Sequence, residues 1–217
     1  MKVLTHTGGI AATCCYVIAD ETTKEAVLID APDHTAGPLL QEVQRLGFSL
    51  RGLWLTHGHF DHVADHALVP DGPVLIHPLA ADKLRNPAAQ LRAFERRSGM
   101  RVPLDIPPRE PDRLIEDGEV LELGGLRATV IHTPGHCPGH VCLHFAEQNV
   151  LVGGDLIIGG AVGRTDLPDS NPAALDESIR RVMQLPDETT LLPGHGTPST
   201  LGDERASNPY VRAALAD

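Results

Sequence analysis

The feature that most constrains this chain is the segment at residues 56–62, which reads Thr-His-Gly-His-Phe-Asp-His. It places three imidazoles and one carboxylate within six residues, directly after the apolar run at 52–56. Polar side chains at the end of a buried strand need binding partners, because burying them alone costs free energy. A surface patch of histidines is the alternative interpretation, and the dense spacing disfavours it. The segment therefore predicts a fold that presents ligand-type side chains at the end of a core strand.

The spacing within this segment is that of a metal site. His57 and His59 are two residues apart, so in extended chain their side chains project to the same side. Asp61 and His62 follow one turn later and can face the same point from the start of a helix. Imidazole and carboxylate groups together are suitable ligands for zinc, iron or manganese. These four residues are candidate metal ligands.

Three ligand-type residues farther along the chain share one context, an apolar strand that ends in glycine. His136 follows Val-Ile-His-Thr-Pro-Gly, Asp155 follows Val-Leu-Val-Gly-Gly, and His195 follows Leu-Leu-Pro-Gly. Glycine allows backbone geometry that is closed to other residues and lets the chain approach a crowded site. Each of these residues alone could be a chance loop residue. Together with the first segment, they predict four strands that present ligands at one edge of the sheets.

Apolar runs and turn residues alternate along the chain, which is typical of an α/β protein. The runs at 15–19 and 26–30 flank a polar turn and predict a hairpin. Apolar residues at helical spacing predict helices at 35–46 and 173–185, the second entered through an Asn-Pro pair. The other expected elements are strands at 52–56, 74–77, 119–123, 126–132, 140–145, 149–153 and 190–192, helices at 79–98 and 209–216, and a proline-rich loop at 102–111. No linker splits the chain, so we expect one domain over residues 1–217, with helices outside two sheets.

Charge and cysteine content exclude several functions. Lys and Arg number 18 and Asp and Glu 29, which gives a formal charge of −11. Binders of nucleic acid or of anionic membranes draw affinity from clustered basic residues, so we expect neither partner. No apolar run approaches the roughly 20 residues of a membrane-spanning helix, and residues 1–19 are interpreted as strands rather than as a signal peptide. The four cysteines include the adjacent pair Cys14 and Cys15, which can rarely bond to each other without strain, so we expect reduced thiols and a cytoplasmic protein.

The ordered set of candidate ligands resembles that of the metallo-β-lactamase fold hydrolases. Within that superfamily, four motifs are most similar to the glyoxalase II group, especially its short bacterial members. The motifs are Thr-Pro-Gly-His at 133–136, Gly-Gly-Asp at 153–155, Gly-Arg-Thr-Asp at 163–166 and Pro-Gly-His-Gly at 193–196. The resemblance covers nearly the whole chain. It implies an αββα sandwich of two mixed β-sheets flanked by helices, with a dinuclear metal site at its edge.

The resemblance also implies a role for each candidate ligand. It implies that one divalent ion is bound by His57, His59 and His136, and that a second is bound by Asp61, His62 and His195. It also implies that Asp155 bridges the two ions. Asp61 and Asp155 are expected to act in catalysis as well. We expect zinc, with iron or manganese as alternatives, because ligands of this type do not determine the metal.

Two divalent ions at such a site would give the protein hydrolytic chemistry. They lower the pKa of a shared water far enough to supply hydroxide at neutral pH. That hydroxide would attack a carbonyl whose developing oxyanion is stabilised by one of the metals. Thioesters suit this site, since a thiolate leaves readily. The resemblance therefore implies hydrolysis of a small-molecule, thiol-derived substrate such as S-D-lactoylglutathione.

Arg164 and Asp166 lie in the loop after the expected bridging carboxylate, so they should border the metal site. An arginine there can bind a substrate carboxylate through two parallel hydrogen bonds. The alternative is an internal Arg–Asp pair that shapes the loop. If Arg164 both binds the substrate and pairs with Asp166, then Asp166 would position Arg164 for the substrate.

Other polar residues receive weaker assignments. His140 could orient the loop around His136, Asp65 could hold a ligand imidazole, and Cys137 could be a soft ligand. Cys142 lies in a strand pattern and is expected to be a small core residue. The histidines without a ligand-like setting, which we expect in the core or on the surface, are His6, His34, His66, His77, His132 and His144.

Two other functions remain open from the sequence. One is a persulfide dioxygenase, in which a single iron held by His57, His136 and Asp155 oxidises glutathione persulfide. The other is a metal-binding protein without enzymatic activity. Longer glyoxalase II proteins grip glutathione with a C-terminal helical extension, and no such extension is seen before Asp217. Another thiol or a smaller thioester is therefore a further possibility for the substrate, and the oligomeric state is left open.

Overall fold

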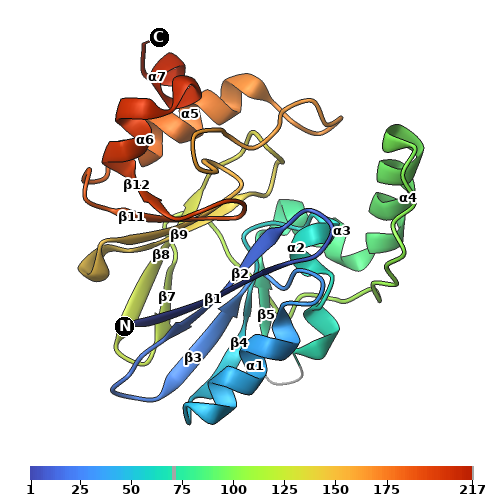
Figure 1. Ribbon diagram of the computed structural model, residues 1–217, viewed down its shortest axis with the longest axis vertical. Coiled ribbons are helices and arrows are strands. Elements are labelled where there is room, and N and C mark those ends of the chain that lie inside the picture. The colour runs from blue at the N-terminus through green and yellow to red at the C-terminus, as the bar shows by residue number, and fades with distance from the viewer. Residues whose placement is uncertain (70–71, 217) are drawn as a thin grey trace. The chain divides into compact units, whose positions relative to one another are not determined.

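The computed structural model describes residues 1–69 and 72–216. The chain forms two compact units, each built on a six-stranded sheet (Figure 1). Unit 1 contains residues 1–114 and 123–125, and unit 2 contains residues 115–122 and 126–217. The single domain expected from the sequence stays a prediction.

The sheet of unit 1 has its strands in the order of the chain. They are β1 (Lys2–Gly8), β2 (Thr13–Ala19), β3 (Glu25–Ile29), β4 (Ser49–Trp54), β5 (Val74–Ile76) and β6 (Arg113–Leu114). β2 and β3 are antiparallel, as the predicted hairpin requires, whereas β3 to β6 are parallel. Parallel neighbours need a crossover connection, and helix α1 (Ala36–Arg45) supplies it between β3 and β4. The sheet is therefore mixed.

The helices of unit 1 cover its aliphatic core. α1 packs against β1, β2 and β4, with Leu39 and Val43 in the same apolar cluster as Leu28 and Leu53. The short helix α2 (Phe60–Val63) follows the histidine-rich segment. The remaining helical segments of unit 1 are the 3-10 turns η1 (His66–Leu68) and η2 (Pro78–Ala80) and the helices α3 (Ala81–Arg85) and α4 (Pro87–Ser98).

The single helix expected at 79–98 is wrong in one respect, because it is interrupted at Asn86. α3 ends at Arg85 and α4 begins at Pro87. A proline disfavours helical geometry in the residue before it. Asn86 accordingly has φ −139° and ψ 58°.

The sheet of unit 2 is also mixed. Its order is β12-β11-β10-β9-β8-β7. β10 and β11 pair in parallel, whereas β8 with β9, β9 with β10 and β11 with β12 are antiparallel. The strands are β7 (Val120–Leu123), β8 (Leu126–His132), β9 (Val141–Phe145), β10 (Val150–Gly154), β11 (Thr190–Pro193) and β12 (Ser199–Thr200), with a 3-10 turn η3 (Ala146–Gln148) before β10. The predicted strands of this half are confirmed, whereas the two-residue strands β6 and β12 are not foreseen.

Three helices complete the core of unit 2. They are α5 (Pro172–Val182), α6 (Leu201–Ser207) and α7 (Pro209–Ala216). Ile179 of α5 and Val211 of α7 pack in one apolar cluster with Leu151 and Leu191 of the sheet. α6 is not predicted from the sequence; it begins after Thr200, whose hydroxyl caps the N–H of Asp203. Among the residues that the structure describes, no helix has the length and apolar character needed to cross a membrane.

Parallel pairing of neighbouring strands places the polar side chains that follow them at the same edge of the sheet. In unit 1, Asp30 follows β3 and Thr56 follows β4, so both lie at the carboxyl ends of neighbouring strands. In unit 2, Asp155 follows β10 and His195 follows β11, and the N–H of Gly194 donates to the carbonyl of Gly154 over 2.7 Å. Side chains from distant parts of the sequence therefore meet at one edge of each sheet.

Candidate functional site

A buried aspartate organises the ligand-type residues of unit 1. Asp30 accepts hydrogen bonds from the backbone N–H of Thr56 at 2.8 Å, from the Thr56 hydroxyl at 2.7 Å, and from Nδ1 of His62 at 2.8 Å. It is only 2% exposed. Asp30 is not among the candidate residues predicted from the sequence, although it follows a buried apolar strand just as Asp155 does. That shared position is the signal that could have identified it.

These hydrogen bonds determine which ring nitrogens can bind a metal. A carboxylate only accepts, so Nδ1 of His62 carries the proton and Nε2 keeps its lone pair. The Thr56 hydroxyl gives its hydrogen to Asp30 and therefore accepts from Nδ1 of His57, at 3.1 Å. Nε2 of His57 is thus also an acceptor. Both buried imidazoles present the nitrogen that metal-binding histidines use.

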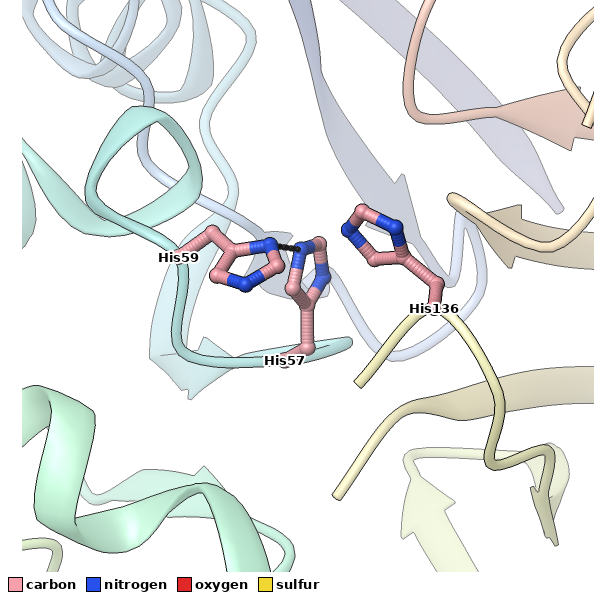
Figure 2. A group of neighbouring side chains, drawn as sticks. All are labelled: His57, His59 and His136. Atoms are coloured by element: carbon pink, nitrogen blue, oxygen red, sulfur yellow. Dashed lines mark hydrogen bonds between the residues drawn. The ribbon is translucent and has the colours of Figure 1, made fainter. Parts of the chain in front are cut away.

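His59 and Asp61 complete the cluster of unit 1. Nδ1 of His59 lies 3.0 Å from Nε2 of His57. Figure 2 marks this hydrogen bond with a dashed line. Two nitrogens on one tetrahedral zinc ion are about 3.3 Å apart, given Zn–N bonds of 2.0–2.1 Å. Oδ2 of Asp61 accepts from the hydroxyl of Thr13 at 3.1 Å and lies 3.7 Å from Nε2 of His62. The four residues predicted from segment 56–62 are therefore gathered at one place.

In unit 2, His136 is fixed by the backbone of a distant loop. Its Nδ1 donates to the carbonyl of Arg164 over 2.9 Å, so Nε2 again keeps its lone pair. Gly135 before it has φ +139°, and a Cβ there would come within 2.4 Å of the backbone of Leu175. Only glycine allows this path. The carbonyl of Arg164 could not be predicted from the sequence, because a backbone atom carries no residue-type signal.

Asp155 lies between the two histidines of unit 2. Its Oδ2 is 3.3 Å from Nε2 of His195 and 3.6 Å from Nε2 of His136. Gly154 before it has φ +49°, a left-handed conformation that favours glycine. A Cβ on Gly163 would lie 1.9 Å from the carbonyl oxygen of Asp155, so the loop after β10 passes directly over that residue.

His140 is a buried contact of Asp155. Its Nε2 accepts from the backbone N–H of Asp155 at 2.9 Å, and its Nδ1 bonds to the hydroxyl of Thr133 at 2.8 Å. His140 is expected from the sequence to orient the loop around His136. The structure instead shows it bonded to the N–H of Asp155 and to Thr133, which precedes that loop.

Arg164 and Asp166 form an internal ion pair, which is one of the two roles expected for them from the sequence. Nε and Nη2 of Arg164 donate to the two carboxylate oxygens of Asp166 over 2.6 and 2.7 Å. Hydrogen bonding to this carboxylate raises the pKa of the Arg164 guanidinium. More than half of each side chain is exposed. Binding of a substrate by this pair stays a prediction.

Asp65 does not have the role suggested for it. Its Oδ2 accepts from the N–H groups of Thr35 and Ala36, at 2.9 and 3.1 Å. These groups lie at the start of α1, where unpaired N–H groups attract a carboxylate. Sequence proximity to His62 favoured Asp65, but the buried partner of His62 is Asp30.

Other histidines and cysteines have structural roles. Nε2 of His66 bonds to the carbonyl of Pro107 at 2.8 Å, and burial lowers the pKa of His66. Nδ1 of His77 accepts from the N–H of Leu79 at the start of η2. Cys142 is fully buried, as predicted for a core residue, and burial raises its pKa to about 12.

The structure thus places the candidate ligands in two groups. Unit 1 carries His57, His59, Asp61 and His62, and unit 2 carries His136, Asp155 and His195. Within each unit the side chains come together as described above. The complete set, which draws on both units, stays a prediction.

Comparisons with known proteins give consistent matches over most of the chain. A family model described as the metallo-beta-lactamase superfamily matches residues 9–195. The hydroxyacylglutathione hydrolase GloC of Haemophilus influenzae is 34% identical over 203 residues, which cover 92% of each chain. The crystal structure of BLEG-1 B3 metallo-beta-lactamase is similar with a TM-score of 0.83 and 29% identity, covering 97% of this chain and 99% of that one. The crystal structure of TTHA1623 in a di-iron-bound form has a TM-score of 0.81 and 37% identity, covering 95% and 99%.

Proposed function

Because the chain belongs to the metallo-β-lactamase superfamily, we propose that it is a metal-dependent hydrolase that cleaves an acyl thioester such as S-D-lactoylglutathione. The products would be a hydroxy acid and a free thiol. The family and the fold of two mixed β-sheets flanked by helices, both predicted from the sequence, are confirmed by the matches. The thioester substrate is supported by the Haemophilus influenzae relative, whose name describes hydrolysis of hydroxyacylglutathione.

The observation that carries the proposal is the position of Asp155 between two imidazole nitrogens, at 3.3 and 3.6 Å. A carboxylate placed in this way has the donor chemistry of a ligand that bridges two metal ions. The nitrogen of His136 that faces it keeps its lone pair, because the other ring nitrogen donates to a carbonyl. The residues of unit 2 therefore fit a metal ion chemically.

The proposed centre takes ligands from both units. We propose that one ion would take His57, His59 and His136 and that the other would take Asp61, His62 and His195, with Asp155 as the ligand shared by both. Figure 2 draws the three imidazoles proposed for the first ion. Bound divalent ions would acidify water and polarise a carbonyl. We propose zinc, with iron as the alternative that the di-iron form of TTHA1623 supports.

The protein's own residues would orient the ligands and bind the substrate. Asp30 and the carbonyl of Arg164 hold the Nδ1 protons of His62 and His136, which leaves both Nε2 atoms available to the metals. The exposed guanidinium of Arg164, held by Asp166, is proposed to bind a carboxylate of the substrate. We also propose a cytoplasmic location, since the four cysteines, all within the described part of the chain, form no disulfide.

The first experiment measures metal content and reaction type together. The protein is purified without added metal, and zinc, iron and manganese are counted per chain. Hydrolysis of S-D-lactoylglutathione is then followed beside oxygen uptake with glutathione persulfide and hydrolysis of a chromogenic β-lactam. We expect thioester hydrolysis without oxygen uptake. One iron per chain with persulfide-dependent oxygen uptake would overturn the proposal, as would activity on the β-lactam alone.

A ligand variant tests whether two ions are bound. His195→Ala should lower the metal content from two ions to one per chain, because only one of the two proposed ions uses His195. The matched control is His34→Ala, which removes a histidine that is 86% exposed at its side chain. An unchanged metal content in His195→Ala would contradict the two-metal site.

A further inference from the structure

Four hydrogen bonds join the carbonyl of Gly153 in β10 to the N–H of Asp155, just after that strand, through three buried side chains. Cys142 Sγ donates to the carbonyl of Gly153 at 3.3 Å, and the Thr133 hydroxyl lies 3.4 Å from the same sulfur. The hydroxyl also bonds to Nδ1 of His140, whose Nε2 accepts from the N–H of Asp155. Thr133, His140 and Cys142 are each 0% exposed. These four bonds and the backbone from Gly153 to Asp155 form a closed ring. Both of its backbone contacts therefore lie within two residues of Asp155.

Strand pairing brings these side chains together. β8 and β9 are antiparallel, with Ile131 opposite Cys142, and the N–H of Thr133 donates to the carbonyl of His140 at 2.9 Å. His140 and Cys142 are two residues apart and so point to the same side of the strand. The ring thus links the ends of β8, β9 and β10.

Every hydrogen bond in the ring has a fixed direction. The carbonyl of Gly153 can only accept, so Cys142 donates its single hydrogen there. The Thr133 hydroxyl must then donate to the sulfur and accept from His140. The N–H of Asp155 can only donate, which requires the lone pair on Nε2 of His140. The buried Cys142 thiol, whose pKa is raised to about 12, keeps its proton throughout the neutral range.

We propose that His140, held as the neutral Nδ1–H tautomer by Thr133 and Cys142, is the positioning residue that fixes Asp155 as a metal ligand. This inference rests on the proposed function for the metal itself. His140 contacts the backbone of Asp155 and leaves its carboxylate available to face His136 and His195. Partners that orient a metal ligand typically contribute about 10–100-fold to metal affinity.

The tautomer is tested first, in the metal-free protein. Long-range ¹H–¹⁵N correlation spectra of ¹⁵N-labelled protein identify the protonated nitrogen of each imidazole. We expect a proton on Nδ1 of His140 and a slowly exchanging N–H on Asp155. A proton on Nε2 of His140, or a rapidly exchanging Asp155 amide, would overturn the proposal whether or not the protein binds metal.

Metal affinity then tests the positioning role. His140→Leu removes both hydrogen bonds and should weaken zinc binding by about 10–100-fold in a competition titration with a chelator. His140→Gln keeps an acceptor and a donor on neighbouring atoms and should restore most of the affinity. Thr133→Val interrupts the ring one bond farther from Asp155 and should have a smaller effect.

The matched control is His144→Leu. His144 lies two residues after Cys142 on β9, is partly buried, and takes no part in the four bonds. Its loss should leave zinc affinity unchanged. Equal affinity in His140→Leu and the unaltered protein would contradict the inference. If the unaltered protein binds no metal, the proposed function fails, and the tautomer measurement still decides whether the ring exists.

Discussion

The two units hold their candidate ligands in different ways. In unit 1, four ligands lie within six residues, and the side chain of Asp30 anchors two of them, His62 directly and His57 through Thr56. In unit 2, three ligands come from separate strand ends and have separate anchors: the carbonyl of Arg164 holds His136, and the side chain of His140 holds the N–H of Asp155. A compact ligand segment can be fixed by one carboxylate. Dispersed ligands need loops whose entire path is fixed.

Among the variants that test this difference between the units, Asp30→Ala should cause the largest losses of stability and of zinc affinity. Three buried donors would lose their acceptor, at about 1–3 kcal/mol each, so the free energy of unfolding should fall by about 3 kcal/mol or more. Zinc affinity should fall with it, because both buried imidazoles of unit 1 lose their orientation. Urea unfolding and a chelator competition measure the two effects.

The control for this substitution is Asp65→Ala. It removes an aspartate that caps α1 and contacts none of the candidate ligands through its two hydrogen bonds. A stability loss of about 1 kcal/mol with unchanged zinc affinity is expected. Equal losses of zinc affinity in the two variants would show that Asp30 has no special role.

Gly163→Ala tests the loop path in unit 2 and should have the second largest effect. The new Cβ would lie 1.9 Å from the carbonyl oxygen of Asp155, so the loop must move and carry the carbonyl of Arg164 away from His136. We expect stability to fall by about 1–3 kcal/mol, as in other overpacked positions, together with weaker zinc binding. Thermal unfolding and the chelator competition measure both.

Gly37→Ala is the matched glycine control. A Cβ at Gly37, in the first turn of α1, would meet no atom within 4 Å. Alanine should stabilise the helix by about 0.5–1 kcal/mol. An unaltered zinc affinity in Gly163→Ala would mean that the loop can shift without disturbing the ligands.

Arg164→Ala should have the smallest effect on stability, because its carbonyl stays in place when the side chain is removed. Loss of an exposed Arg–Asp pair changes the free energy of unfolding by less than about 1 kcal/mol. If the guanidinium binds a substrate carboxylate, KM for the thioester should rise about tenfold, with kcat within about twofold. Steady-state kinetics measure both constants.

Arg45→Ala is the corresponding control, since Arg45 makes a similar two-pronged, exposed pair with Glu42 on α1. Its KM should equal that of the unaltered protein. The same KM in Arg164→Ala would limit the Arg164–Asp166 pair to shaping its loop.

Local sequence patterns predict much of the fold. The hairpin of β2 and β3, the helix at 36–45 and the strand ends before His136, Asp155 and His195 all follow from apolar runs and turn residues. The break at Asn86 could have been read from Pro87, because proline restricts the residue before it. The short strands β6 and β12 depend on pairing partners rather than on their own two residues.

The supporting groups of the site were harder to predict than the ligands. Asp30 and Thr56 are 26 residues apart and meet only because β3 and β4 are parallel neighbours. The carbonyl of Arg164 and the N–H of Asp155 are invisible in a sequence, since every residue has such groups. Ligand types can therefore be predicted from residue identity and spacing, whereas their orientation depends on topology and loop path.

The backbone of Asp30 limits how the metal preference of this protein could be retuned. Asp30 has φ +56°, a left-handed conformation that aspartate and asparagine tolerate better than most residues. Randomising this position should therefore return a very small set of functional sequences. Libraries aimed at a different ion are better directed at His59, which is partly exposed and lies outside the hydrogen bonds made by Asp30.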